Sequence, residues 1–152
     1  LSLNHPRFSQ DLLQGLHQFT SKHGLDPKAI CLEIDEHWLF QSTALLRDLL
    51  TQIRAANYVL CLDHYGRAQS RLHSQSKYPF DRVKIAASLV EQLTHQPNAH
   101  QSQAGTQIRA ILAVAQALGQ TPIALLPAMQ RPSLELLQAL PCPYYQEPFT
   151  EG

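Results

Sequence analysis

Apolar residues along the chain follow two patterns, short continuous runs and repeats at helical spacing. The continuous runs predict five strands, at residues 1–4, 29–35, 58–62, 80–85 and 122–126. The helical repeats predict five helices, at residues 8–19, 42–57, 87–93, 106–119 and 132–140. Strand and helix alternate, and this order is typical of parallel βα units with right-handed crossovers. The pattern alone leaves open whether the sheet is doubly wound or part of a closed (β/α)₈ barrel.

Details of the pattern lead to further expectations. In the helix at 42–57 we expect Ser42 as the N-cap and a buried stripe of leucines and isoleucine, formed by Leu45, Leu46, Leu49, Leu50 and Ile53. Residues 96–105 are polar and punctuated by Gly and Pro, which predicts a loop. The tail at 141–149 is aromatic and Pro-rich, and it is not among the strands and helices predicted above.

Polar residues that could carry chemistry lie on or just after three of the strands. The strand at 58–62 is expected to end at Leu62 and to be followed at once by Asp63, His64 and Gly66. Glu33 interrupts the apolar strand 29–35, and Lys84 lies near the end of 80–85. The carboxyl ends of parallel strands are where α/β folds gather their functional residues. We therefore expect a site at this end of the sheet.

Each of these residues also has a purely structural interpretation. Glu33 could pair with Lys84 across the sheet, because buried charges are rarely left without a partner. Asp63 could cap the following turn, and Lys84 could instead extend to solvent. His64 could be a surface-loop histidine. Gln146 and the preceding pair Tyr144-Tyr145 could serve packing at the end of the barrel.

Composition excludes several classes of protein. The 152 residues contain 12 Lys plus Arg and 12 Asp plus Glu, so the formal net charge is zero. This balance argues against binding to a nucleic acid polymer or to an anionic membrane. No apolar run approaches the roughly 20 residues of a membrane span, and the N-terminal residues do not resemble a signal peptide.

Three widely spaced cysteines, Cys31, Cys61 and Cys142, form no CxxC motif. We expect them to be buried free thiols, which fits a reducing cytoplasm. The chain begins without Met, directly in a strand-like segment. We therefore expect the natural domain to start further upstream.

Several segments, among them LSLNHPRF at the start of the chain, resemble the EAL domain family, bacterial modules that cleave the signalling dinucleotide cyclic di-GMP. The residues DHYGRA after the strand at 58–62 resemble the family's Asp-Asp-Phe-Gly-Thr-Gly. The segments LEIDE (32–36), FDRVKIAAS (80–88) and CPYYQEP (142–148) resemble Leu-Glu-Leu-Thr-Glu, Val-Asp-Xaa-Leu-Lys-Ile-Asp and Cys-Asp-Xaa-Xaa-Gln-Gly-Tyr. The resemblance runs from Leu1 to about Phe149. It implies a single domain over residues 1–152, the C-terminal two-thirds of a (β/α)₈ TIM-barrel-like α/β fold.

The same resemblance assigns roles to individual residues. Glu33 and Asp63 match metal ligands, and the metal implied is Mg²⁺ or Mn²⁺. Lys84 matches the lysine of the catalytic site, and Glu36 matches the residue that braces the loop after the strand at 58–62. Arg67 and Gln146 are expected to contact a bound nucleotide, Arg67 because a guanidinium suits phosphate.

The chain departs from the family pattern at most of the other metal-binding positions. His64 and Ala86 stand where the family has Asp, and Leu125, in the segment IALLPAM (123–129), stands where it has Glu. The metal-binding Asn falls on Ser2, although Asn4 is close by. The Glu-Ala-Leu motif itself does not occur in these residues. Mg²⁺ and Mn²⁺ favour carboxylate and amide oxygens, so these changes predict a degenerate site.

We therefore expect a catalytically inactive EAL-like domain in a cytoplasmic bacterial signalling protein. It would act through a regulatory protein or through its own dimer partner, with no required cofactor. One alternative is a receptor that binds cyclic di-GMP without cleaving it, in which Arg67 or Arg71 meets a phosphate. Another is a weak residual phosphodiesterase that uses Mg²⁺ or Mn²⁺.

Overall fold

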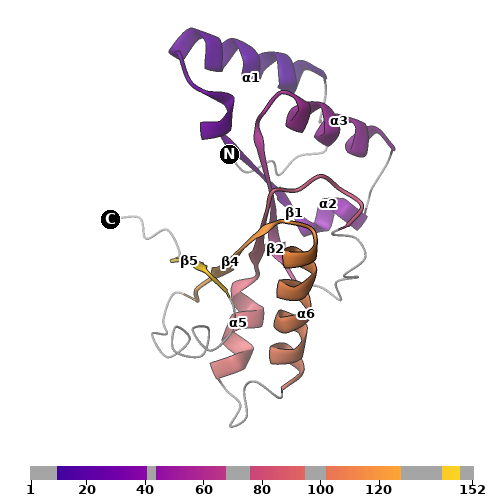
Figure 1. Ribbon diagram of the computed structural model, residues 1–152, viewed down its shortest axis with the longest axis vertical. Helices are drawn as coiled ribbons and strands as arrows, with labels where there is room; N and C mark the ends of the chain where they lie inside the picture. Colours follow the sequence, from indigo (N-terminus) through magenta and orange to yellow (C-terminus); the bar gives the residue numbers. More distant parts are fainter. Residues whose placement is uncertain (1–9, 41–43, 68–75, 95–101, 128–141, 148–152) are drawn as a thin grey trace.

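The computed structural model describes residues 10–40, 44–67, 76–94, 102–127 and 142–147 (Figure 1). The expected strand at 1–4 and helix at 132–140 lie outside these residues, as do Ser2, Asn4, Ser42 and Arg71. The helices within the described ranges are α1 (Gln10–His23), α2 (Glu36–Phe40), α3 (Ala44–Ala55), α5 (Ala87–Thr94), α6 (Gln103–Ala117) and the short 3₁₀ helix η1 (Pro27–Ala29).

Five strands form one sheet in which every neighbouring pair is parallel. They are β1 (Cys31–Asp35), β2 (Val59–Tyr65), β3 (Arg82–Ile85), β4 (Thr121–Leu125) and β5 (Tyr144–Gln146). Their order across the sheet is the order along the chain. Successive βα units that each add the next strand are the arrangement of a (β/α)₈ barrel, so the expected parallel, TIM-barrel-like α/β fold is confirmed.

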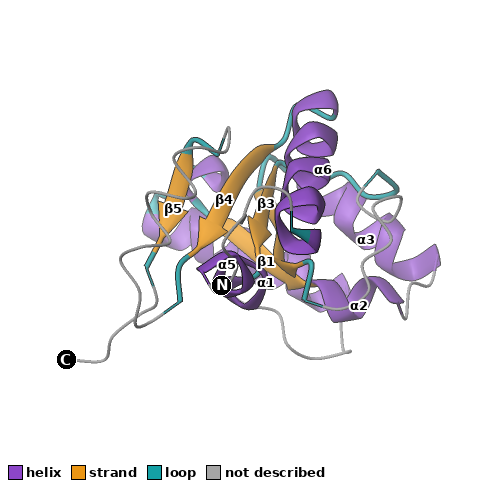
Figure 2. Cartoon of the chain, turned by 90° about the horizontal axis from the view of Figure 1, so that it is seen from below, coloured by secondary structure: helices purple, strands orange, loops and turns teal. Residues whose placement is uncertain are grey.

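The two faces of the sheet differ in chemistry. One face is fully buried and packs beneath helices α3, α5 and α6, which contact strands β2, β3 and β4 (Figures 1 and 2). Its side chains are aliphatic and have no exposed surface: Leu32, Ile34, Leu60, Leu62, Val83 and Ile85. Because side chains alternate along a strand, the other face carries Glu33, Cys61, Asp63 and Lys84. The polar residues singled out in the sequence therefore share one face of the sheet.

Strand β2 is longer than the pattern predicts. The expectation that the strand ends at Leu62 is wrong, because β2 continues through Asp63 and His64 to Tyr65. Its register against β3 shifts between Leu62 and Tyr65, and His64 has a φ of 53°. This irregularity resembles a β-bulge, which bends a strand and re-aims its side chains. Because Asp63 and His64 are polar, a search for apolar runs could not show that the strand continues through them.

Helix α6 also begins earlier than expected. The polar loop predicted at 96–105 extends too far, since residues 103–105 belong to the helix. Ser102 is the N-cap, and its Oγ accepts a hydrogen bond of 3.0 Å from the backbone N–H of Gly105. This cap compensates for the low helix propensity of Gly105 and Thr106 in the first turn.

Two further expectations differ from the structure. The buried stripe predicted for α3 includes Leu45, which is 78% exposed, while the other four members of that stripe are buried. The segment Tyr144–Gln146 forms strand β5, although its sequence predicts no strand. It pairs with β4 from Ile123 to Leu125. Its conformation therefore depends on a neighbouring strand that periodicity cannot reveal.

In the part of the chain that the structure describes, no helix combines the length and apolar character that a membrane span requires.

Candidate functional site

A small pocket lies at the carboxyl ends of the strands, where the sequence predicts a site. Its volume is about 240 Å³. All five strands or the residues that follow them contribute to its lining, which consists of Glu33, Asp63, His64, Lys84, Ala87, Leu125, Leu126, Gln146 and Glu147. The fold thus brings together four of the six predicted site residues. Their catalytic, ligand-binding and metal-binding roles stay predictions.

Lys84 and Glu33 form an ion pair inside this pocket, with the Lys84 ammonium donating a hydrogen bond to Oε1 of Glu33. Lys84 is only 6% exposed, so the interpretation in which it extends to solvent is wrong. The alternative in which it pairs with Glu33 across the sheet is confirmed. A buried ammonium requires such a partner because the loss of its hydration is costly.

Asp63 lies on β2 and faces the same pocket. Burial raises the pKa of the Asp63 carboxyl above its ordinary value, and the charge of Glu33 acts in the same direction. The nearby His64 and Lys84 side chains act against this rise but do not cancel it. Asp63 Oδ1 accepts a 2.9 Å hydrogen bond from the backbone N–H of His64, inside the strand. The interpretation of Asp63 as a cap for the following turn is therefore wrong.

His64 lies between two carboxylates. Its Nδ1 is 3.1 Å from Oδ2 of Asp63 and 3.5 Å from Oδ2 of Asp35. Neither contact has the direction of a hydrogen bond, so Nδ1 is a buried atom with no hydrogen-bond partner in the structure. The interpretation of His64 as a surface-loop histidine is wrong, since it belongs to β2 and lines the pocket. The sequence pattern does not single out Asp35.

Glu36 supports the chain just beyond β2. It is 4% exposed, and its Oε2 accepts a 3.2 Å hydrogen bond from the backbone N–H of Gly66. Gly66 has a φ of +92°, and a Cβ placed there would lie 2.8 Å from a side-chain carbon of Leu89. Only glycine suits both the conformation and the space. This contact is the one expected of Glu36 as a brace for the loop after the strand.

Arg67 follows Gly66 and is exposed, and it does not line the pocket. Gln146, on β5, does line it and is also exposed. The backbone carbonyl of Gln146 accepts a 2.9 Å hydrogen bond from the N–H of Leu126. This bond extends the β4–β5 pairing by one residue beyond the strand.

Two other lining residues decide the character of the pocket wall. Leu125 presents an apolar side chain directly opposite Gln146 in the strand register. Glu147 adds a carboxylate that sequence reasoning missed, because it follows a segment with no predicted element. The sequence did offer one signal for Glu147, which is its position directly after Gln146 in the segment CPYYQEP.

The donor set does not suit a pair of divalent cations. Such a centre needs several carboxylate oxygens around each ion. Glu33 is already engaged by an ammonium, Leu125 offers no donor, and a histidine nitrogen suits softer metals. Among the described residues, no group of three or more His, Cys, Asp or Glu side chains is arranged to hold a metal ion.

Cys31 and Cys61 lie on the same face of the sheet, each two residues before a carboxylate of its own strand, Glu33 or Asp63. Glu33 lies opposite Cys61 in the register, so the two thiols are diagonal neighbours on β1 and β2. A hydrogen bond from Cys61 lowers the pKa of Cys31 to about 7, against the effect of burial, and the nearby Arg82 adds to this. The same contact raises the pKa of Cys61. All three cysteines are free thiols, as expected, although Cys31 is only half-buried.

Comparison with known proteins identifies the family. The sequence matches the EAL domain over residues 1–146. This chain belongs to the EAL domain family. The match includes the segments LEIDE, DHYGRA and FDRVKIAAS and the first five residues of CPYYQEP. The fold of the chain agrees with that of solved EAL domains.

Individual relatives are more distant. The chain is 26% identical over 111 residues to the cyclic di-GMP phosphodiesterase RocR of Pseudomonas aeruginosa, covering 73% of this chain and 27% of RocR. The EAL domain of Mycobacterium smegmatis DcpA superposes with a TM-score of 0.79 at 23% identity, over 93% of this chain and 61% of that one. A manganese and cyclic di-GMP complex of Klebsiella pneumoniae BlrP1 superposes with a TM-score of 0.80 at 20% identity, over 97% and 36%. The chain thus spans less than a third of RocR, and the structural likenesses bear on the fold.

Proposed function

We propose that this EAL domain is non-catalytic and acts in bacterial regulation through contact with a regulatory protein or with its own dimer partner. The observation that carries the proposal is the Glu33–Lys84 ion pair. It neutralises one of the two carboxylates that match family metal ligands, within the pocket where the reaction would take place.

Metal-assisted hydrolysis of a phosphodiester needs cations that bridge the reacting phosphate. To bind one, Glu33 would have to give up its contact with a buried ammonium. The other carboxylates of the lining are Asp63 and Glu147, while His64 and Leu125 stand where the family pattern has carboxylates. The missing oxygen ligands at these two positions support loss of phosphodiesterase activity.

Pocket size supports contact with a protein over capture of a dinucleotide. Pockets for small molecules generally enclose about 300–1,000 Å³, and this pocket encloses about 240 Å³. The lysine of its lining, Lys84, already pairs with Glu33, and Asp63 and Glu147 are carboxylates that repel a phosphate. Few groups are left to engage two phosphates.

The second candidate is a receptor that binds cyclic di-GMP without cleaving it. Arg67 favours this function, because it is exposed just beyond β2 and a guanidinium binds phosphate with two parallel hydrogen bonds. Gln146 lies on the pocket wall, where it could bond to a guanine edge or a ribose. RocR is named as a cyclic di-GMP phosphodiesterase, which makes this dinucleotide the ligand to test.

Two measurements separate these functions. The purified protein is incubated with cyclic di-GMP and Mg²⁺ or Mn²⁺, and the products are resolved by chromatography. We expect no linear dinucleotide, and its appearance at multiple turnovers would refute the proposal in favour of residual phosphodiesterase activity. Calorimetry with cyclic di-GMP up to high micromolar concentration is expected to give no heat. Saturable binding without cleavage would establish the receptor instead.

A genetic experiment tests the contact directly. In a strain that lacks the gene, the full-length protein is supplied as wild type or with Glu33→Gln and Asp63→Asn together, and transcripts are compared. A protein that acts by contact needs neither carboxylate, so both forms should restore the wild-type profile. Failure of the variant alone, at equal protein level, would contradict the proposal.

A further inference from the structure

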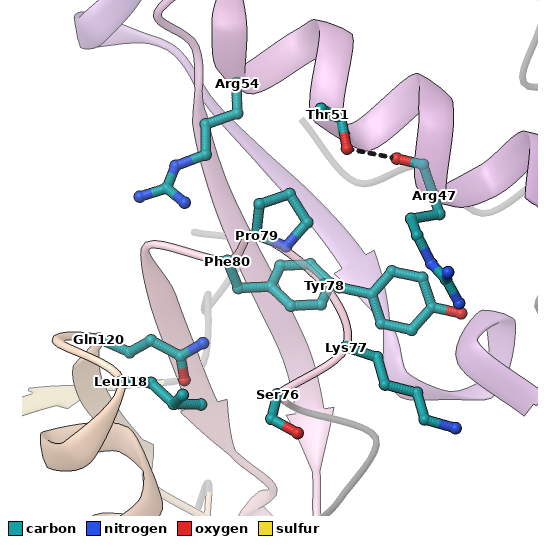
Figure 3. Close-up of a pocket in the computed structure, with 10 residues that line it drawn as sticks. All are labelled: Arg47, Thr51, Arg54, Ser76, Lys77, Tyr78, Pro79, Phe80, Leu118 and Gln120. Atoms are coloured by element: carbon teal, nitrogen blue, oxygen red, sulfur yellow. Dashed lines mark hydrogen bonds between the residues drawn. The ribbon is translucent and has the colours of Figure 1, made fainter.

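A second hollow lies at the opposite end of the sheet from the carboxylate pocket. It has a volume of about 400 Å³ and lies near the starts of β2, β3 and β4 (Figure 3). Helix α3 contributes Arg47, Thr51 and Arg54, whose spacing places them on one face of the helix. The segment that leads into β3 contributes Ser76, Lys77, Tyr78, Pro79 and Phe80, and the turn after α6 contributes Leu118 and Gln120.

The charge of this hollow is entirely positive. Its lining includes Arg47, Arg54 and Lys77 and no Asp or Glu. Lys77 belongs to a stretch, residues 64–80, that contains no acidic residue. In a chain with zero net charge, three cations around one hollow are a marked local excess.

One of the three cations has a structural role. Arg54 Nε lies 3.2 Å from Oδ1 of Asp81, a residue that does not line the hollow. The other carboxylate oxygen of Asp81 accepts a 2.9 Å hydrogen bond from the N–H of Leu60. Arg54 also lies in the last turn of α3, where a cation complements the helix dipole. Its presence therefore needs no ligand.

Arg47 and Lys77 have no such explanation. Neither takes part in an ion pair with any described residue, and both side chains are exposed. Arg47 lies in the first half of α3, where the helix dipole disfavours a cation. Figure 3 shows both side chains running toward the same side of the hollow, next to the ring of Tyr78. This leaves two cations available to one anionic group.

Two aromatic rings pack beneath the hollow. Tyr78 and Phe80 are 5% and 3% exposed, and their ring centroids are 6.1 Å apart. Pro79 is half-buried and Leu118 is 43% exposed, so both offer apolar surface to an occupant. Thr51 Oγ1 donates to the carbonyl of Arg47 and can still accept a hydrogen bond. Charge, apolar surface and a hydroxyl thus lie within one enclosure.

We propose that this hollow binds a small phosphate monoester that carries a flat apolar group, with Arg47 and Lys77 holding the phosphate. A guanidinium fork and an ammonium together match a phosphate dianion. The volume lies within the range of small-molecule pockets and suits a molecule the size of a nucleoside monophosphate. The hollow is separate from the carboxylate pocket, with which it shares no lining residue.

Calorimetry with AMP as the probe tests the proposal, with adenosine as the matched uncharged probe. We expect saturable binding of AMP and binding of adenosine at least about 10-fold weaker, because the charge-assisted contacts are lost. The double variant Arg47→Gln, Lys77→Gln should weaken AMP binding at least about 30-fold. The control Lys22→Gln, Lys28→Gln removes the same charge from residues outside the hollow and should change it by less than about 2-fold.

The proposal would be overturned if AMP did not bind at low millimolar concentration, or if both double variants lost AMP affinity to the same extent. It would also be overturned if AMP shifted amide NMR signals elsewhere in the protein but not those of Tyr78, Phe80 and Gln120. Binding of an acidic peptide without AMP would likewise replace the proposal with a protein-docking site. The outcome is independent of the proposed function, because the variants leave the carboxylate pocket unchanged.

Discussion

Lys84 on β3 reaches past the intervening strand β2 to pair with Glu33 on β1, and Asp63 on β2 faces the same space. One ammonium therefore lies near two carboxylates and pairs with one of them. In this arrangement the ion pair stabilises the inner face of the sheet and, at the same time, occupies a group that the family pattern assigns to metal binding. The structural and functional interpretations of Glu33 are thus in competition.

Replacing Lys84 by Met should destabilise the fold by about 1–3 kcal/mol, because Glu33 is left without its partner. The figure is below that for a fully buried pair because the Glu33 side chain is 26% exposed. The double variant Glu33→Gln, Lys84→Met should recover most of the loss. Urea denaturation of the wild type, the two single variants and the double variant completes the cycle. Strictly additive effects would show that the two side chains do not interact.

Asp63→Asn should stabilise the protein at pH 7. Burial raises the pKa of Asp63 in the folded state, so the folded protein binds this proton more tightly than the unfolded chain does. The stabilising contribution of Asp63 is then complete below its ordinary pKa and is lost as the pH rises through the folded value. Asn does not ionise and avoids this loss.

The advantage of the Asp63→Asn variant should therefore shrink as the pH falls toward about 4, near the ordinary pKa of Asp. Urea denaturation between about pH 3.5 and 7.5 measures it. Asp48→Asn changes an exposed carboxylate on α3 and serves as the control. A difference for the Asp63 variant that grows toward low pH would mean that its pKa is depressed instead.

Much of the fold can be predicted from the sequence because its main strands are continuous apolar runs and its helices have regular stripes. β1 and β3 lie where these runs predict them, and α5 begins at the expected Ala87. Two of the errors have a common cause, which is that non-local contacts fixed the conformation. β5 forms because it pairs with β4, and β2 continues through polar residues that line the pocket.

The site can be predicted in part for the same reason. Strand ends gather on one edge, so the sequence alone places Glu33, Asp63 and Lys84 together. The sequence leaves two alternatives open for Lys84, which are pairing with Glu33 and extension to solvent. The distance between the two side chains in the folded chain decides between them. Asp35 could not be predicted as a site residue, because a carboxylate at a strand end can serve many roles. In addition, its position 3.5 Å from His64 depends on the bulge in β2.

Gly66→Ala should destabilise the fold by about 2–4 kcal/mol. A non-glycine residue at a φ of +92° is strained, and the added Cβ would lie 2.8 Å from Leu89. Thermal or urea denaturation measures the change. Gly15→Ala is the matched control, because Gly15 lies within α1 and a Cβ there meets nothing within 4 Å. That variant should gain about 0.5–1 kcal/mol, and equal effects of the two would contradict the assigned strain.

Cys31 should be the fastest of the three cysteines to react with iodoacetamide at neutral pH. The hydrogen bond from Cys61 lowers its pKa to about 7, so a large fraction is thiolate, the reactive form. Cys61 and Cys142 are buried, with raised pKa values. Mass spectrometry of labelled peptides across neutral pH should give a midpoint near about 7 for Cys31.

Cys61→Ala removes the donor, so the midpoint for Cys31 should move upward and labelling at neutral pH should slow. Cys142→Ala leaves the pair intact and should not change it. A profile for Cys31 that is the same in all three proteins would show that the thiol pair does not control its ionisation.

Restoring acidic residues to the pocket should restore affinity for a divalent cation. His64→Asp with Leu125→Glu adds two carboxylates to the wall of a pocket that already holds Glu33, Asp63 and Glu147. Oxygen donors of this kind suit Mn²⁺ and Mg²⁺, and the added charge competes with Glu33 for the Lys84 ammonium. Calorimetric titration with Mn²⁺ should show binding at least about 10-fold tighter than in the wild type. The pair His64→Asn with Leu125→Gln matches the shape without the charge and should gain far less; an equal gain would mean that shape, and not anionic charge, limits the site.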